Sequence, residues 1–362
     1  MARRLSFSRR SWVISISSSF LLSVGLLTQF SIKANTRAIP PDFNPSTQLF
    51  AVFIGLVLLM IAYKTPFRIW HRLAWPGYFI SVLLLILVRQ FGELVFGSKR
   101  WILLAGFQIQ PSEFLKPALI LLGANIMPIS TARIRLLGFL KNALLFVIPT
   151  LMVLVQPNLG TAIILMSIWL VQLLISRVDP KMITVTFAVI SLFILASYPL
   201  MNQYQKDRID SFLSNSDISD SGYNVAQARI AIGSGGLTGN GLSGGSQSQL
   251  NFLPAQHTDF VFAVISEKLG LIGGLAVLLA EVLLPVMAWR IMALVRDPKL
   301  TMIAGGCAVV FSIHMIINIG MNLGLSPVTG IPLPLVSYGG SSVVVSLFMI
   351  GWLLAIDSKI KN

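Results

Sequence analysis

Ten apolar stretches recur along the 362-residue chain and constrain its fold more than any other feature. A helix needs roughly 20 apolar residues to cross about 30 Å of hydrocarbon. Each span must satisfy its own backbone hydrogen bonds in lipid, which favours helices, and the alternation typical of an outer-membrane barrel is absent. The pattern predicts an all-α, polytopic integral membrane protein with about ten transmembrane helices, at 12–30, 48–63, 73–90, 111–127, 140–155, 159–176, 182–200, 259–285, 300–324 and 338–356.

The distribution of charge predicts the orientation of these spans. The chain carries 27 Lys and Arg against 13 Asp and Glu, and charged residues make up only 11% of it, against about 25% in a soluble domain. Seventeen of the basic residues fall on segments that an inside N-terminus places inside, and eight fall outside. This bias predicts both termini in the cytoplasm and a large extracytoplasmic loop, 201–258, between helices 7 and 8. The net charge of +14 is therefore interpreted as a consequence of membrane topology. No nucleic-acid partner is predicted.

One polar stretch, Tyr204 to Gly270, is the only long segment of mixed polar composition, so chemistry is expected there or just beneath it. It lies within a single transmembrane domain, 1–362. The N-terminal ARRLSFSRR resembles the start of a signal peptide but is interpreted as a retained anchor. The lone Cys307 excludes an intramolecular disulfide, and the three histidines have no metal-ligand spacing.

Asp259, in the motif HTDF, sits where the polar stretch meets the eighth span. One interpretation is structural, because Thr258 or Asp259 can cap the following helix and favour its dipole. The other is functional, with the carboxylate held at the membrane surface as a general base. Both interpretations remain open at this point.

Glu113 and Lys116, near the outer start of the fourth span, are three residues apart and share a helix face. They form either a mutually neutralised pair or part of a functional interior, which intramembrane charges usually face. Glu267 and Lys268 raise the same question in the eighth span. Adjacent residues do not face one another on a helix, so these two are expected to have separate partners.

Three of the eight cations on the predicted outer side are candidates for binding an anionic group: Lys99, Arg100 and Arg208. They suit either lipid headgroups or a diphosphate. The run Gly239 to Gly244 matches a dinucleotide fingerprint, but it lacks the required strand and helix on either side, so nucleotide binding is rejected. Its glycines predict a mobile or tightly turning loop. QPNLG (156–160) and the proline-rich 326–342 are expected to interrupt helix.

Several long motifs, in order along nearly the whole chain, resemble those of the SEDS family of shape, elongation, division and sporulation proteins. They are GSKRWI (97–102), IQPSEFLK (109–116), QPNLGTA (156–162), GYNVAQARIAIGSGGLTGNG (222–241), FLPAQHTDFVFAVISEKLG (252–270) and PVTGIPLPLVSYGGSS (327–342). The last of these, with NIGMNLGLS before it, is similar to the branch concerned with rod shape. The chain departs from the family pattern at Asn158 and Lys268, where acidic residues are common.

The resemblance implies a peptidoglycan glycosyltransferase that polymerises lipid II on the outer face of the bacterial cytoplasmic membrane. It implies a class B penicillin-binding protein as partner, contacts with membrane lipids, and a possible Mg or Mn ion as cofactor. The family's essential aspartate falls on Asp259. The expected diphosphate-binding or site-shaping residues are Lys99, Arg100, Glu113, Lys116, Arg208 and His257. A flippase for the same lipid and a non-catalytic scaffold remain alternatives.

Overall fold

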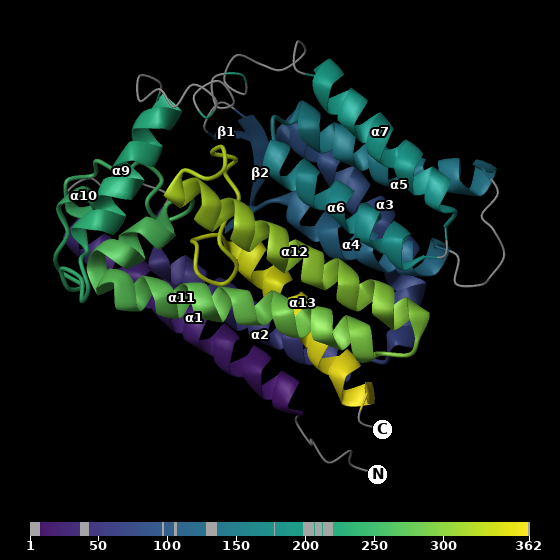
Figure 1. Cartoon of the computed structure of the whole chain (residues 1–362), viewed down its shortest axis with the longest axis horizontal. Helices are drawn as coiled ribbons and strands as arrows, with labels where there is room; N and C mark the ends of the chain where they lie inside the picture. The colour runs from purple at the N-terminus through teal and green to yellow at the C-terminus, as the bar shows by residue number, and fades with distance from the viewer. Residues whose placement is uncertain are drawn as a thin grey trace.

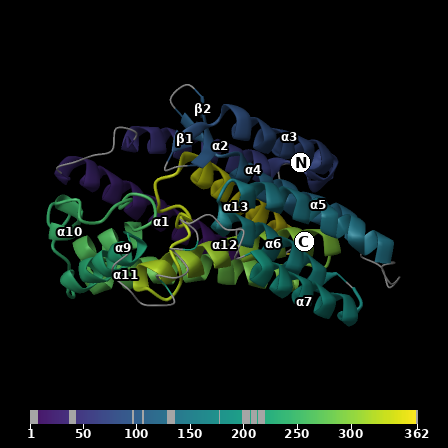
Figure 2. The ribbon, with the colours of Figure 1, turned by 90° about the horizontal axis from the view of Figure 1, so that it is seen from above.

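A computed structural model shows a bundle of long helices lying side by side (Figures 1 and 2). It describes residues 8–36, 43–95, 98–104, 107–127, 136–176, 178–197, 206, 212 and 220–360. The helices of the bundle are α1 (Arg9–Asn35), α2 (Pro45–Lys64), α3 (Phe67–Phe91), α4 (Pro111–Ile126), α5 (Leu136–Val155), α6 (Leu159–Ile175), α7 (Pro180–Ser197), α11 (Val261–Leu294), α12 (Pro298–Leu323) and α13 (Gly340–Ile360). Smaller elements are α9 (Asp220–Ser234), α10 (Ser246–Gln249), β1 (Glu93–Val95), β2 (Ser98–Leu104) and β3 (Phe107–Ile109).

Seven of the described helices are long and apolar enough to cross a membrane: α1, α2, α3, α5, α11, α12 and α13. The other three predicted spans fall on α4, α6 and α7, of which α4 has 16 residues and α6 has 17. The chain is thus a multi-pass membrane protein. The full count of ten spans and the side on which the long loop lies remain predictions.

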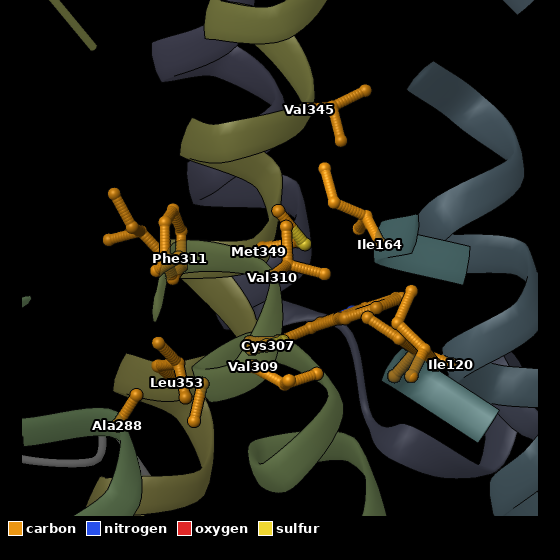
Figure 3. Close-up of a cluster of buried hydrophobic side chains, with 14 of the residues drawn as sticks. Ile120, Ile164, Ala288, Cys307, Val309, Val310, Phe311, Val345, Met349 and Leu353 are labelled. Carbon is orange, nitrogen blue, oxygen red and sulfur yellow. The ribbon is translucent and has the colours of Figure 1, made fainter. Parts of the chain in front are cut away.

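The helix α13 lies at the centre of the bundle. In its most apolar window 78% of residues are buried, against 28% for α2 and α3 on the outside. It packs on α2, while α11 packs on α12 and α12 on α6 and α4. Figure 3 shows the resulting core, where Cys307 and Phe311 of α12 meet Met349 of α13 among residues that include Ile120 of α4 and Ile164 of α6.

Large apolar side chains cover much of the outer surface of the bundle. Phe53 of α2 is 63% exposed, Phe79 of α3 is 60% exposed and Ile272 of α11 is 64% exposed. In water such a surface would mark an interaction site, whereas in a membrane it is solvated by lipid tails. The exposed apolar belt is therefore the lipid-facing side of the helices.

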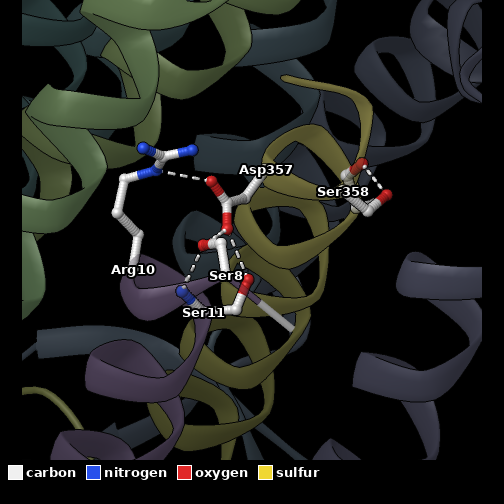
Figure 4. A network of polar contacts seen from close by, with 6 residues as sticks. Ser8, Arg10, Ser11, Asp357 and Ser358 are labelled. Atoms are coloured by element: carbon white, nitrogen blue, oxygen red, sulfur yellow. Dashed lines mark hydrogen bonds and ion pairs between the residues drawn. The ribbon is translucent and has the colours of Figure 1, made fainter. Parts of the chain in front are cut away.

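A buried carboxylate joins the first and last helices at the end of the bundle away from α9 and α10 (Figures 1 and 4). Asp357 of α13 accepts hydrogen bonds from Ser8 and Ser11 and forms an ion pair with Arg10 of α1 at 2.7 Å. Asp357 is fully buried, so these three partners replace the water that its charge would otherwise need.

Three features differ from the sequence-based expectation. Residues 93–109 include a small antiparallel sheet, in the order β1-β2-β3, ahead of α4. Within the predicted loop, residues 220–234 form the helix α9. The eighth span, expected to end at residue 285, continues as α11 to Leu294, because Pro285 is accommodated inside the helix.

Candidate functional site

The main chain around Asp259 forms a tight turn before α11 rather than a capped helix start. The N–H groups of Thr258 and Asp259 both donate to the carbonyl of Ala255, at 3.1 Å each. The N-cap residue of α11 is Phe260, and its side chain makes no capping hydrogen bond. The structure thus places Phe260, rather than Thr258 or Asp259, at the N-cap position of α11. Asp259 itself is partly exposed at this end of the bundle.

Two buried amides of α12 hold Asp259 through its main chain. Asn318 and Asn322 donate side-chain N–H groups to the carbonyl oxygen of Asp259, at 3.1 and 3.0 Å. The Asn322 side-chain oxygen also accepts the N–H of Ala263 at 3.1 Å, which satisfies a first-turn donor of α11. Both asparagines are fully buried, so the amides are ordered by packing.

The loop that joins α12 to α13, residues 325–339, holds the same segment from the other side. Ser337 donates its hydroxyl to the carbonyl of Thr258 at 2.6 Å and accepts the N–H of Leu333 at 2.7 Å. The N–H of Tyr338 donates to the carbonyl of His257 at 2.8 Å. The loop is non-helical between Ser326 and Gly339, as its prolines and glycines predict. Consecutive carbonyls of the HTD motif are thus each held by a group far away in sequence.

His257 lies against two aromatic rings, those of Phe43 and Tyr338, with ring centroids 4.6 and 5.7 Å away. Burial disfavours the charged imidazolium and lowers the pKa of His257 from 6.5 to about 4. Its Nδ1 atom is buried and has no hydrogen-bond partner among the described residues. At neutral pH this side chain is an uncharged neighbour of the Asp259 turn.

Glu113 and Lys116 form the buried pair that their spacing predicts. The Lys116 ammonium lies 2.6 Å from Glu113 and 2.9 Å from Nε2 of His314 on α12. The other ring nitrogen of His314 lies 2.9 Å from the carbonyl of Pro332. Since Lys116 is only 1% exposed and has two partners, the geometry favours its site-shaping role. This chain of contacts ties α4 to α12 and to the 325–339 loop.

Arg100 of β2 binds main-chain carbonyls at the break between α5 and α6. Its Nε donates to the carbonyl of Gln156 at 2.7 Å, and its guanidinium also donates to that of Pro157. These carbonyls belong to the interruption that QPNLG predicts, where the helix ladder no longer supplies their donors. The neighbouring Lys99 is exposed on the same strand. Arg208 lies outside the described residues.

The glycine-rich segment, residues 236–241, docks on a kink in α11. At Gly270 the backbone leaves helical geometry, with φ 68° and ψ −168°. The carbonyls of Glu267 and Lys268 accept the N–H groups of Asn240 and Gly241, each at 3.0 Å. The predicted tight turn is present, and it supplies partners to backbone groups that the kink frees.

The side chains of Glu267 and Lys268 have separate partners, as their adjacency predicts. The Glu267 carboxylate accepts the N–H groups of Gln247 and Ser248, at 2.8 and 3.1 Å. The Lys268 ammonium donates to the carbonyls of Leu242 and Gly244, at 2.8 and 3.2 Å. Both residues therefore order the 242–248 segment, and a lysine at position 268 serves this purpose where a carboxylate would not.

Sequence reasoning missed His314, Asn318 and Asn322, which do much of the positioning at this site. A signal was present, because the three polar residues recur every fourth position along an otherwise apolar helix and so share one face. The described residues contain no group of three or more His, Cys, Asp or Glu side chains that could hold a metal ion.

Comparison with known proteins identifies the family. The sequence model of the FtsW/RodA/SpoVE family of cell cycle proteins matches residues 11–362 of this chain. The chain is 37% identical over 312 residues to the peptidoglycan glycosyltransferase MrdB of Escherichia coli K12, covering 86% of this chain and 84% of that one. It is 36% identical over 361 residues to a probable peptidoglycan glycosyltransferase FtsW of Trichlorobacter lovleyi, covering 94% and 93%.

Solved structures agree with this result. One chain, from a structure on the coordination of polymerization and crosslinking by a peptidoglycan synthase complex, has a TM-score of 0.81 and 26% identity over 99% of both chains. The rod shape determining protein RodA of Thermus thermophilus has a TM-score of 0.72 and 25% identity over the full length of both chains. The chain therefore belongs to the FtsW/RodA/SpoVE family of cell cycle proteins, the SEDS family, and is most like its RodA members.

Proposed function

We propose that this SEDS protein is a peptidoglycan glycosyltransferase that polymerises lipid II into glycan strands during cell elongation. The relatives named as peptidoglycan glycosyltransferases support the reaction class. The observation that carries the site is the anchoring of Asp259: its carbonyl is held by two buried amides while its side chain stays partly exposed. A general base needs this combination of fixed position and access.

The transfer joins the 4-hydroxyl of an acceptor sugar to the anomeric carbon of the donor sugar. The bond from that carbon to the lipid-linked diphosphate breaks, its electron pair leaves with the diphosphate, and the configuration inverts. Asp259 takes the proton of the acceptor hydroxyl, a role worth about 10²- to 10⁴-fold in rate. The diphosphate leaves with negative charge, so cations beside it stabilise the transition state. Lys99, exposed on β2, and Arg208 are assigned this role.

Arg100, Glu113 and Lys116 are assigned a site-shaping role, because the described contacts engage them with protein groups. His257 supports the Asp259 turn as a neutral aromatic partner. The site is placed on the outer face of the cytoplasmic membrane, with both termini inside and the 201–258 loop outside. A class B penicillin-binding protein, which crosslinks the product, is the proposed partner. The structural neighbour from a peptidoglycan synthase complex supports such an assembly.

The experiment is polymerisation of fluorescent lipid II by the purified chain with its penicillin-binding partner, whose own active site is blocked. The variant Asp259→Asn keeps the size of the side chain and removes the base. The matched control is Asp179→Asn, since Asp179 accepts the N–H of Lys181 before α7 and asparagine retains that contact. Loss of long glycan strands in Asp259→Asn alone supports the proposal. Equal strand formation in both variants would show that the base lies elsewhere.

A lipid II flippase is the second candidate, and one observation favours it. Glu281 lies deep in α11, is only 1% exposed, and its Oε1 has no hydrogen-bond partner among the described residues. Ionisable groups at membrane depth often mark transport pathways. If the wild-type chain makes no strands with its partner yet moves lipid II across vesicle membranes, the flippase replaces the polymerase. A chain that does neither is a scaffold.

A further inference from the structure

A cavity of about 570 Å³, wide open to the surface, lies at the end of the bundle opposite Asp259. It lies between the start of α3, the end of α4, the start of α12 and the end of α13. Lys299, on its wall, is 19 residues before Asn318 on the same helix. At 1.5 Å per residue this separation is about 28 Å, close to the thickness of the hydrocarbon core. The cavity therefore faces the opposite membrane surface and is not part of the Asp259 site.

Four cationic side chains from three helices line the cavity: Arg68 and Arg72 of α3, Lys299 of α12 and Lys359 of α13. One carboxylate, that of Asp297, accompanies them. Asp297 already accepts the N–H of Lys299 at 2.9 Å as the N-cap of α12. Arg68, Arg72 and Lys299 form no ion pair with any carboxylate in the described part of the chain. The cavity thus carries four cations and one carboxylate, and three of these cations have no carboxylate partner among the described residues.

The two arginines are arranged for an oxyanion with several acceptor atoms. Arg68 and Arg72 are four residues apart, so they stand side by side on one face of α3. A guanidinium offers a planar fork of N–H donors that matches phosphate oxygens.

The floor of the cavity adds polar groups. Asn125 donates to the carbonyl of His71 at 2.7 Å, and the two side chains also interact with each other. The Oδ1 of Asn125 and the Nδ1 of His71 are buried and have no further hydrogen-bond partner among the described residues. A ligand that brings both acceptor oxygens and a hydroxyl donor complements such a floor.

We infer that this cavity, defined by Arg68, Arg72, Lys299 and Lys359, is a binding site for a phosphate ester with hydroxyl groups. The shared chemistry fits the headgroup of an anionic phospholipid and also a free phosphate from solution. Basic pockets between the ends of transmembrane helices bind anionic headgroups in this way. The site is separate from glycosyl transfer and does not depend on the proposed function.

The test is calorimetric titration of the purified full chain in a neutral detergent at fixed ionic strength. The probes are dihexanoyl-phosphatidylglycerol, dihexanoyl-phosphatidylcholine and inorganic phosphate. The cavity variant is Arg68→Gln with Arg72→Gln. The matched control is Arg9→Gln with Arg290→Gln, which removes two exposed arginines that do not line the cavity.

We expect saturable binding of the phosphatidylglycerol probe by wild type and control, weakened on the order of tenfold in the cavity variant. Inorganic phosphate that displaces this probe identifies free phosphate as a ligand, and its failure to do so identifies the headgroup. Absence of saturable binding of both anionic probes overturns the inference. Equal weakening in the control also overturns it, because the overall positive charge of the protein would then account for binding. Equal affinity for the phosphatidylcholine probe overturns it as well, because the acyl chains would then account for binding.

Discussion

At the scale of single residues, the position of Asp259 depends on side chains from other parts of the chain. Asn318 and Asn322 hold its carbonyl, and Ser337 holds that of Thr258 next to it. A buried carbonyl that loses its donors costs about 1–3 kcal/mol, so these residues stabilise the turn as well as orient it. Positioning groups of this kind are expected to affect rate and stability together.

Replacing Asn322 with alanine removes the donor to Asp259 and the acceptor for Ala263. We expect the free energy of unfolding to fall by about 1–3 kcal/mol and polymerisation to fall at least tenfold, because the turn loses a fixed contact. Thermal unfolding and strand synthesis measure the two effects. Asn142→Ala is the control, since the one contact of that buried amide among the described residues is with the Met127 sulfur, at 4.0 Å. Full activity in Asn322→Ala would contradict the positioning role.

The pKa of His257 predicts how stability depends on pH. Burial lowers it from 6.5 to about 4, so between these values the unfolded chain binds a proton that the folded chain does not. Stability is complete above pH 6.5 and falls as the pH drops toward 4, by roughly 3 kcal/mol in total. Unfolding midpoints from pH 7 to 4 measure this loss. We expect His257→Phe to show a smaller slope, and an unchanged slope would refute the assignment.

At the scale of elements, α11 and the glycine-rich segment form one unit. The kink at Gly270 frees backbone groups of a long helix, and the 236–241 segment pairs with them. Glu267 and Lys268 then hold the 242–248 segment with their side chains. The helix is bent where the loop docks, so the loop and the start of α11 are positioned together.

Gly270→Ala tests this unit. A Cβ at Gly270 would lie 2.4 Å from the N atom of Gly239 and 2.5 Å from the carbonyl oxygen of Leu237, in a backbone conformation that side chains rarely adopt. We expect a loss of about 3 kcal/mol or more in the free energy of unfolding. Gly233→Ala is the control, because a Cβ added at this position of α9 would meet no other atom within 4 Å and alanine favours helix. A Gly270→Ala variant as stable as wild type would exclude the kinked pairing.

At the scale of the whole molecule, the bundle has two chemically distinct ends. The Asp259 turn and the 325–339 loop lie at one end, and the Asp357 network with the basic cavity lies at the other. The charge bias of the sequence predicts that the second end faces the cytoplasm. Long helices between them fix the two ends about one membrane thickness apart.

Thiol labelling tests this orientation. The side chain of Leu237 in the glycine-rich segment is 68% exposed, and Arg290 near the end of α11 is also exposed. We expect a membrane-impermeant maleimide to label Leu237→Cys in intact spheroplasts and Arg290→Cys only after permeabilisation. The native Cys307 is fully buried and serves as an internal blank. The reverse labelling pattern would show that the topology is opposite to the predicted one.

The sequence by itself determined the membrane class, the approximate helices, the breaks at 156–160 and 326–342, and the separate partners of Glu267 and Lys268. These follow from hydropathy, backbone chemistry and helical spacing, which are local properties. Only the tertiary structure decided that Phe260 takes the N-cap position of α11, that Arg100 binds the carbonyls of Gln156 and Pro157, and that His314, Asn318 and Asn322 lie beside the site. Those contacts join residues far apart in sequence, and which groups meet is set by helix packing rather than by local pattern.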